Sequence, residues 1–94
     1  MEFEWDARKE VANRRKHGVR FDEALRVFAD PLARIFDDPD HSAEEEREII
    51  IGHSARQRLL LVCFTERSDR VRIVSARLTT RREREDYEES TPKR

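Results

Sequence analysis

The chain contains few of the residues that several classes of protein depend on. Its 94 residues include two glycines, three prolines and a single cysteine. With only Gly18 and Gly52, it cannot build a glycine-rich loop that cradles nucleotide phosphates. Cys63 lies inside the apolar run LLLVCF, which indicates a reduced, buried side chain rather than a disulfide or an exposed nucleophile.

Long apolar segments and closely spaced metal ligands are also missing. No run of ten apolar residues and no cleavable signal pattern occurs, so we expect a cytoplasmic protein without a membrane partner. The three histidines and the cysteine lie in separate elements and lack spacings such as C-x-x-C or H-x-x-x-H. We therefore expect no metal ion and no cofactor.

Charge, in contrast, is abundant and unevenly distributed. Charged residues make up 44% of the chain and hydrophobic residues 36%, with a net charge of −1. Residues 55–82 hold eight arginines and two acidic residues, whereas residues 38–54 hold one arginine and six acidic residues. The near-neutral total thus hides a basic block. The length fits one domain with a modest core, over residues 1–90, and a frayed tail at 91–94.

Capping residues mark a first helix. Asp6 is a suitable N-cap and Gly18 a suitable C-terminal stop. Between them Lys9, Asn13 and His17 fall at positions i, i+4 and i+8, which places them on one face. This face is either a solvated polar stripe or a functional surface.

Apolar spacing predicts the remaining elements. Phe21, Leu25 and Phe28 recur at helical spacing on a second, core-facing helix, which Asp30-Pro31 ends. Strands are expected at residues 2–5, 33–37, 47–54, 58–66 and 70–78. Short connections between the last four strands imply antiparallel pairing. The predicted fold is α+β, with helices packed on a curved antiparallel sheet in the order β-α-α-β-β-β-β-α.

The last strand leads directly into a charged helix. Strict alternation along RVRIVSARL would place Arg77 on the same face as Val71 and Ile73. Thr80 and Glu83 have the spacing of a capping box that starts the helix. An arginine at this corner lies near the helix N-terminal amides, so the corner is a plausible phosphate site.

Three blocks of the sequence together resemble one family, the BrnT toxins of bacterial type II toxin-antitoxin pairs. The blocks, found in this order along the chain, are EWDARKEVANRRKHGVRFDEA, DPDHSAEEEREIIIG and RIVSARLTTRREREDYE. The resemblance implies a small RNA-cleaving toxin with a fold related to the RelE-type ribonucleases. It also implies a BrnA-like antitoxin that binds DNA and neutralises the toxin in a hetero-oligomeric complex.

Metal-independent RNA cleavage needs a base, an acid and cations that hold the phosphate. Guanidinium groups suit the phosphate because their planar fork binds two of its oxygens. For each candidate the alternative is a surface or structural role. The candidates for phosphate binding and proton transfer are Arg77, Arg58, Arg47, His41, His17, Lys9, Glu45 or Glu46, and Tyr87.

No single constellation in the sequence is diagnostic of catalysis. The arginine block could equally form an interface for a partner protein or a nucleic acid. The sequence therefore supports an endoribonuclease toxin, with a non-catalytic binding module as the alternative.

Overall fold

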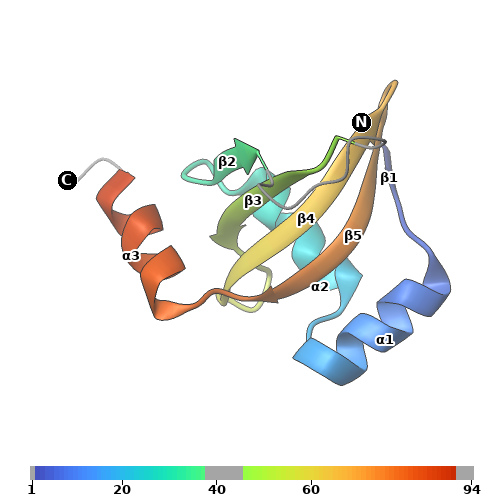
Figure 1. The fold of residues 1–94 in the computed structure, drawn as a ribbon, viewed down its shortest axis with the longest axis horizontal. Helices are drawn as coiled ribbons and strands as arrows, with labels where there is room; N and C mark the ends of the chain where they lie inside the picture. The colour runs from blue at the N-terminus through green and yellow to red at the C-terminus, as the bar shows by residue number, and fades with distance from the viewer. Residues whose placement is uncertain (1, 38–45, 91–94) are drawn as a thin grey trace.

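The computed structural model describes residues 2–37 and 46–90, which form a five-stranded sheet with helices around it (Figure 1). The predicted element order is confirmed, with a 3₁₀ helix continuing the second α-helix. None of the helices in these residues is both long and apolar enough to cross a membrane. The elements are β1 (Glu2–Glu4), α1 (Ala7–His17), α2 (Phe21–Ala24), η1 (Leu25–Ala29), β2 (Arg34–Asp37), β3 (Glu48–His53), β4 (Leu59–Arg67), β5 (Arg70–Leu78) and α3 (Arg81–Ser90).

The sheet is mixed, with strand order β1-β5-β4-β3-β2. β2 to β5 form the predicted antiparallel meander, and the hairpin turn falls at Ser68 and Asp69. β1 differs, because it pairs with β5 in parallel. Two helices separate β1 from the other strands, and a connection of that length permits parallel pairing. Arg72 and Arg70 both pair with Glu4, which ties β1 to the sheet edge.

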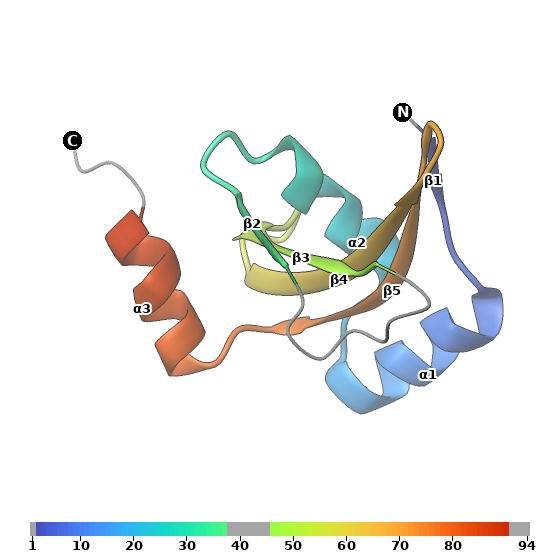
Figure 2. The same cartoon turned by 45° about the horizontal axis from the view of Figure 1, so that its top comes forward.

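The main core lies between one face of the sheet and the segment formed by α2 and η1 (Figures 1 and 2). Phe21 is fully buried as predicted, but Leu25 and Phe28 are only partly buried and Val27 is fully buried instead. The chain tightens into a 3₁₀ helix after Ala24, with three residues per turn, so Val27 lies under Ala24. Phe28 still contributes, since its ring meets that of Phe64 edge to face, with the ring centroids 5.1 Å apart.

Helix α1 packs along the edge of β5 through Asn13. β1 pairs only with residues 70–72, so the rest of that edge needs other hydrogen-bond partners. The Asn13 side chain donates to the Ala76 carbonyl at 2.8 Å and accepts from the Ala76 N–H at 3.0 Å. It also donates to the Val19 carbonyl at 3.0 Å. Asn13 is therefore buried and structural, although it lies on the same side of α1 as Lys9 and His17.

Replacing Asn13 with Ala should destabilise the protein more than replacing an exposed polar residue of the same helix. The change leaves the Ala76 amide and carbonyl without their partner, which is expected to cost about 1–3 kcal/mol. Urea unfolding monitored by circular dichroism measures the loss. Arg14→Ala, at an exposed position of the same helix, is the matched control. Equal stability of the two variants would show that the Asn13 contacts are not needed.

A bulge in β5 changes which face Arg77 occupies. Cys63 is opposite Ser75 while Phe64 is opposite Ile73, so one residue of β5 is skipped. The skip reverses the alternation, so Arg77 does not share a face with Val71 and Ile73 as strict alternation predicted. It lies opposite Leu61, on the second face of the sheet, where α3 packs.

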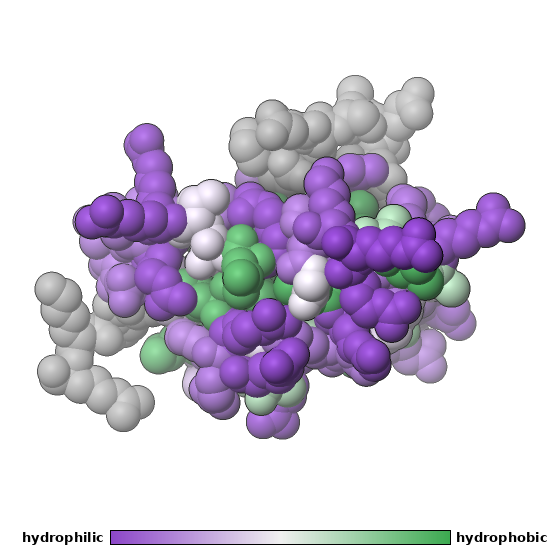
Figure 3. Space-filling model, turned by 90° about the horizontal axis from the view of Figure 1, so that it is seen from below, coloured by the Kyte–Doolittle hydropathy of each residue, from purple (hydrophilic) through white to green (hydrophobic). Residues whose placement is uncertain are grey.

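The second face carries a smaller core and is less completely covered. Ile51, Leu59 and Leu61 pack there against Tyr87 of α3. Helices α3 and α1 lie at opposite sides of the sheet (Figures 1 and 2). Seen from below, apolar side chains gather in the middle of the molecule with hydrophilic ones around them (Figure 3).

Candidate functional site

Arg77 lies at the predicted corner between β5 and α3, but its guanidinium already has an acidic partner. Its two terminal nitrogens donate to the two carboxylate oxygens of Glu83 at 2.8 and 2.9 Å. Glu83 also accepts from the Thr80 N–H at 2.8 Å, and the Thr80 hydroxyl accepts from the Glu83 N–H at 3.2 Å. The predicted capping box is thus confirmed. Hydrogen bonding to Glu83 raises the pKa of Arg77 above its ordinary value, and Arg77 lowers that of Glu83.

Arg58 is part of a clamp that joins the β3–β4 turn to α2. Its guanidinium donates to both carboxylate oxygens of Glu23 at 2.6 and 2.9 Å and to the Gly18 carbonyl at 3.2 Å. The Ser54 hydroxyl donates to the same carboxylate at 2.6 Å. Glu23 is buried, so this bidentate pair fixes the turn to the helix. The geometry favours a structural role for Arg58.

This clamp should make stability depend on pH in the acid range. Hydrogen bonds from Arg58 hold the pKa of Glu23 below its ordinary value, against the opposing effect of burial and with help from Ser54. A depressed folded-state pKa adds stability above the unfolded value, roughly 4.3, and that stability is lost as the pH falls through the folded pKa. The free energy of unfolding of wild type should therefore exceed that of Glu23→Gln most near neutral pH. This difference should shrink below about pH 4.

Urea unfolding of both proteins between pH 3 and pH 7 provides the measurement. Asp22→Asn, at the exposed neighbouring position, is the matched control and should show no such convergence. A gap between wild type and Glu23→Gln that stays constant over this range would contradict the role assigned to the ionised carboxylate.

The other predicted site residues do not form one cluster with Arg77 and Arg58. Arg47 lines a hollow together with Asp37, Glu46 and Glu48. Lys9 and His17 lie, as predicted, on one side of α1, where they line a shallow hollow against β5. Burial, and then the charges of Lys16 and Arg77, lower the pKa of His17. His41, Glu45 and the predicted tail at 91–94 lie outside the described residues.

A cluster that sequence reasoning missed forms where β3 ends. The Asp30 carboxylate Oδ2 accepts from the His53 backbone N–H at 2.8 Å and lies 3.4 Å from the His53 ring nitrogen Nδ1. The Tyr87 hydroxyl donates to the same Oδ2 at 3.3 Å and lies 3.5 Å from Nδ1. The Tyr87 and His53 rings meet edge to face at 5.7 Å. One carboxylate oxygen thus contacts both the backbone and the ring of the histidine, and the tyrosine.

Burial and exposure divide the cluster into a fixed part and an accessible part. The Asp30 side chain is 10% exposed and the His53 side chain 42%. Burial works against ionisation of Asp30, but backbone hydrogen bonds from His53 and Leu32 outweigh it, so the pKa of Asp30 lies below its ordinary value. Burial, and the nearby Asp30 charge, raise the pKa of Tyr87. Asp30 is therefore an ionised group that holds an accessible imidazole.

His53 faces a hollow next to η1. The hollow has a volume of about 400 Å³, and Arg26, Asp30, Ser54 and Gln57 also line it. Arg26 is an exposed member of this lining and carries a guanidinium group. An imidazole oriented by a carboxylate beside a guanidinium can transfer a proton close to a bound phosphate.

Helix α3 contacts both Arg77 on β5 and His53 at the end of β3. Arg77 and Ile51 are both opposite Leu61, and His53 follows Ile51 by two residues, so Arg77 and His53 belong to the same face. Strand spacings place their Cα atoms roughly 12 Å apart. Glu83 pairs with Arg77 and Tyr87 reaches Asp30 and His53, and these two residues of α3 are one helical turn apart.

The signals for this cluster in the sequence are weak. Asp30, His53 and Tyr87 are far apart along the chain and belong to a loop, a strand end and a helix. The one local signal is Gly52, since a glycine inside a strand often marks a close approach of another segment. A Cβ atom at this position would lie 3.1 Å from Asp30 Oδ2 and equally close to Val27 and Ala33, so only glycine admits the Asp30 loop without displacement.

Comparisons with known proteins identify the class. The chain matches the family described as "Ribonuclease toxin, BrnT, of type II toxin-antitoxin system" over residues 5–83. Its structure is similar to the 1.1 Å crystal structure of the Brucella abortus ribonuclease toxin BrnT, with a TM-score of 0.67 and 25% sequence identity. The match covers 86% of this chain and 99% of that chain. No curated protein matches the chain.

A small α+β domain with this sheet and this family match is a ribonuclease toxin. The chain belongs to the BrnT family of type II toxin-antitoxin systems, as the sequence blocks indicated. It is therefore an endoribonuclease whose partner is a protein antitoxin. Within the described residues, no three His, Cys, Asp or Glu side chains are grouped in a way that would hold a metal ion.

Proposed function

We propose that this toxin cleaves RNA by a metal-independent transesterification in which His53 transfers the proton. The imidazole takes the proton of a ribose 2′-hydroxyl, whose oxygen attacks the adjacent phosphorus and displaces the 5′-oxygen of the next nucleotide. The protonated imidazole gives this proton to the departing oxygen, which leaves a 2′,3′-cyclic phosphate and a 5′-hydroxyl. The contact of His53 with Asp30 carries the proposal, because the carboxylate orients Nδ1 and leaves Nε2 for the substrate.

The phosphate would be held by guanidinium groups on either side of His53. Arg26 lines the same hollow, and Arg77 lies on the same face of the sheet. Carboxylates occupy the forks of both Arg77 and Arg58, and Arg58 is the weaker candidate because its partner Glu23 is buried. Tyr87 acts as a positioning residue through Asp30. Arg47, Lys9, His41 and Glu45 remain predictions of site residues.

We also propose that the RNA cleaved is messenger RNA, so that the toxin inhibits translation, and that the antitoxin is BrnA-like. Such an antitoxin binds DNA and neutralises the toxin in a hetero-oligomeric complex. Membership of the BrnT family supports this proposal, since the family is defined by a type II system, in which toxin and antitoxin are both proteins. A gene for a small DNA-binding protein beside the toxin gene would agree with it.

Purified toxin, free of antitoxin, should cleave RNA in the presence of a chelator. The expected products carry 2′,3′-cyclic phosphate and 5′-hydroxyl ends, because the ribose itself supplies the nucleophile. Mass spectrometry of the fragments identifies these ends. Cleavage that disappears with EDTA and returns with a divalent ion would contradict the mechanism. Intact RNA at high protein excess would instead favour the non-catalytic binding module.

A further inference from the structure

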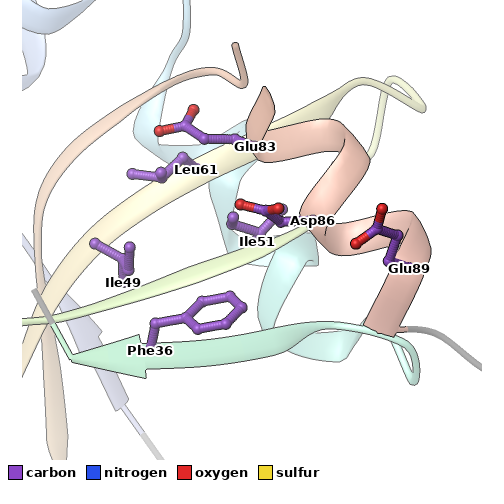
Figure 4. A pocket seen from close by; sticks show the side chains of 7 residues that line it. All are labelled: Phe36, Ile49, Ile51, Leu61, Glu83, Asp86 and Glu89. Atoms are coloured by element: carbon purple, nitrogen blue, oxygen red, sulfur yellow. The ribbon is translucent and has the colours of Figure 1, made fainter. Parts of the chain in front are cut away.

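An apolar groove lies between α3 and the sheet on the side of β2. Its volume is about 390 Å³, and its floor is formed by Phe36, Ile49, Ile51 and Leu61 (Figure 4). The floor is incompletely covered because α3, with the sequence RREREDYEES, has only one large apolar side chain to place on it. That side chain, Tyr87, packs on Ile51 and leaves the surface around Phe36 open. The Phe36 residue is 39% exposed.

The wall of this groove formed by α3 is acidic. The carboxylates of Glu83, Asp86 and Glu89 project from successive turns of α3 along the groove (Figure 4). Glu83 pairs with Arg77, and the side chains of Asp86 and Glu89 are exposed. A row of carboxylates repels RNA, so the groove does not belong to the substrate path. It fits a segment with apolar side chains beside Lys or Arg.

We propose that this groove docks the antitoxin. A short antitoxin segment inserts apolar side chains over Phe36 and Ile49, and its basic side chains pair with Asp86 and Glu89. The proposal rests on the proposed neutralisation of this toxin by a protein antitoxin. β2, which forms one edge of the sheet, borders the groove, so the segment approaches without a rearrangement of the sheet.

Docking in this groove also gives the antitoxin a way to act on Arg77 and His53 without covering the hollow at His53. Helix α3 places Glu83 on Arg77 and Tyr87 beside His53. A segment wedged between α3 and the sheet holds the helix in this position, in which the guanidinium fork of Arg77 is occupied by a carboxylate.

Two matched pairs of variants test the surface. Phe36→Ala removes an apolar group from the floor, and Ile35→Ala removes one from the neighbouring position of β2 that does not line the groove. The double variant Asp86→Lys/Glu89→Lys reverses the charge of the wall. The double variant Glu85→Lys/Glu88→Lys makes the same charge change at exposed positions of α3 outside the groove. The probe is the purified protein encoded by the gene beside the toxin gene, titrated against each full-length toxin by calorimetry.

We expect Phe36→Ala to weaken binding about 30-fold, the scale of an interface hot spot, and the wall reversal to weaken it by about 10-fold. Both controls should stay within about threefold of wild type. RNA cleavage measured without antitoxin should be unchanged in Phe36→Ala and Ile35→Ala, and it should not fall in either lysine variant, since both remove negative charge. Equal losses in a variant and its control would overturn the docking site. So would self-association of the toxin that Phe36→Ala abolishes, since the occupant would then be a second copy.

The two proposals fail in distinguishable ways. Cleavage of RNA together with antitoxin binding that ignores the groove variants would leave the nuclease proposal intact and remove the docking site. Binding that follows the groove variants, with no cleavage of RNA by any protein, would do the reverse.

Discussion

Replacing His53 with Ala should lower RNA cleavage by about 10²- to 10⁴-fold while leaving the fold intact. The loss is expected because the imidazole of His53 is the side chain in the hollow that is suited to accept a proton and then donate it. Its side chain is 42% exposed, so truncation removes little packing. Single-turnover cleavage of a short RNA by wild type and variant, at equal antitoxin-free concentration, measures the effect.

His17→Ala is the matched comparison, because both residues are histidines and His17 was among the candidates for proton transfer in the sequence. His17 lies on α1, in a different hollow from His53. We expect its removal to change cleavage by less than about threefold, since His17 lies near Arg77 but does not line the hollow at His53. Full activity in His53→Ala together with a large loss in His17→Ala would transfer the proton-transfer role to α1.

Asp30→Asn should separate positioning from proton transfer. Asn keeps an oxygen that can accept the His53 N–H but lacks the charge that fixes the ring tautomer. We expect kcat to fall while KM changes little, because the ring keeps its place but is no longer held in one tautomer by the carboxylate. A variant that only loses thermal stability, with kcat unchanged, would show that Asp30 is structural.

Local patterns were sufficient to predict the secondary structure, because each element carries its own boundary signals. Asp6 and Gly18 do cap α1: Asp6 accepts from the N–H groups of Arg8 and Lys9, and Gly18 adopts a left-handed φ of 69°. The Thr80–Glu83 box does start α3. The interactions that set these boundaries lie within three or four residues of each other, so a single sequence reveals them.

The site was harder to predict because its geometry depends on contacts distant in sequence. The β5 bulge moves Arg77 to the other face of the sheet, and nothing in RVRIVSARL marks which residue is skipped. In the sequence, Asn13 has the spacing of a polar stripe. Its structural role depends on the short β1, which leaves part of the β5 edge for the Asn13 amide to bind. His53 acquires a partner only when the Asp30 loop folds over Gly52.

Substitutions of Arg77 and of its partner Glu83 should change cleavage in opposite directions. Arg77→Ala is expected to lower cleavage about 10²-fold, the scale for losing one donor to the charge that develops on the phosphate. Arg77→Lys should restore little, since an ammonium cannot reproduce a two-pronged contact. Glu83→Gln should raise cleavage several-fold, because it removes the carboxylate that competes with phosphate for the guanidinium.

Glu83→Gln is a clean test because glutamine also serves at the third position of a capping box. Its side-chain oxygen can still accept from the Thr80 N–H, so α3 should keep its start while Arg77 loses only the charge of its partner. Circular dichroism and urea unfolding verify that the helix and the fold survive, and steady-state cleavage gives kcat and KM. If Arg77 binds phosphate, the gain appears mainly as a lower KM, and it vanishes in the double variant with Arg77→Ala. A fall in cleavage for both single variants, in equal proportion, would mean that the ion pair itself supports the structure and that Arg77 does not contact RNA.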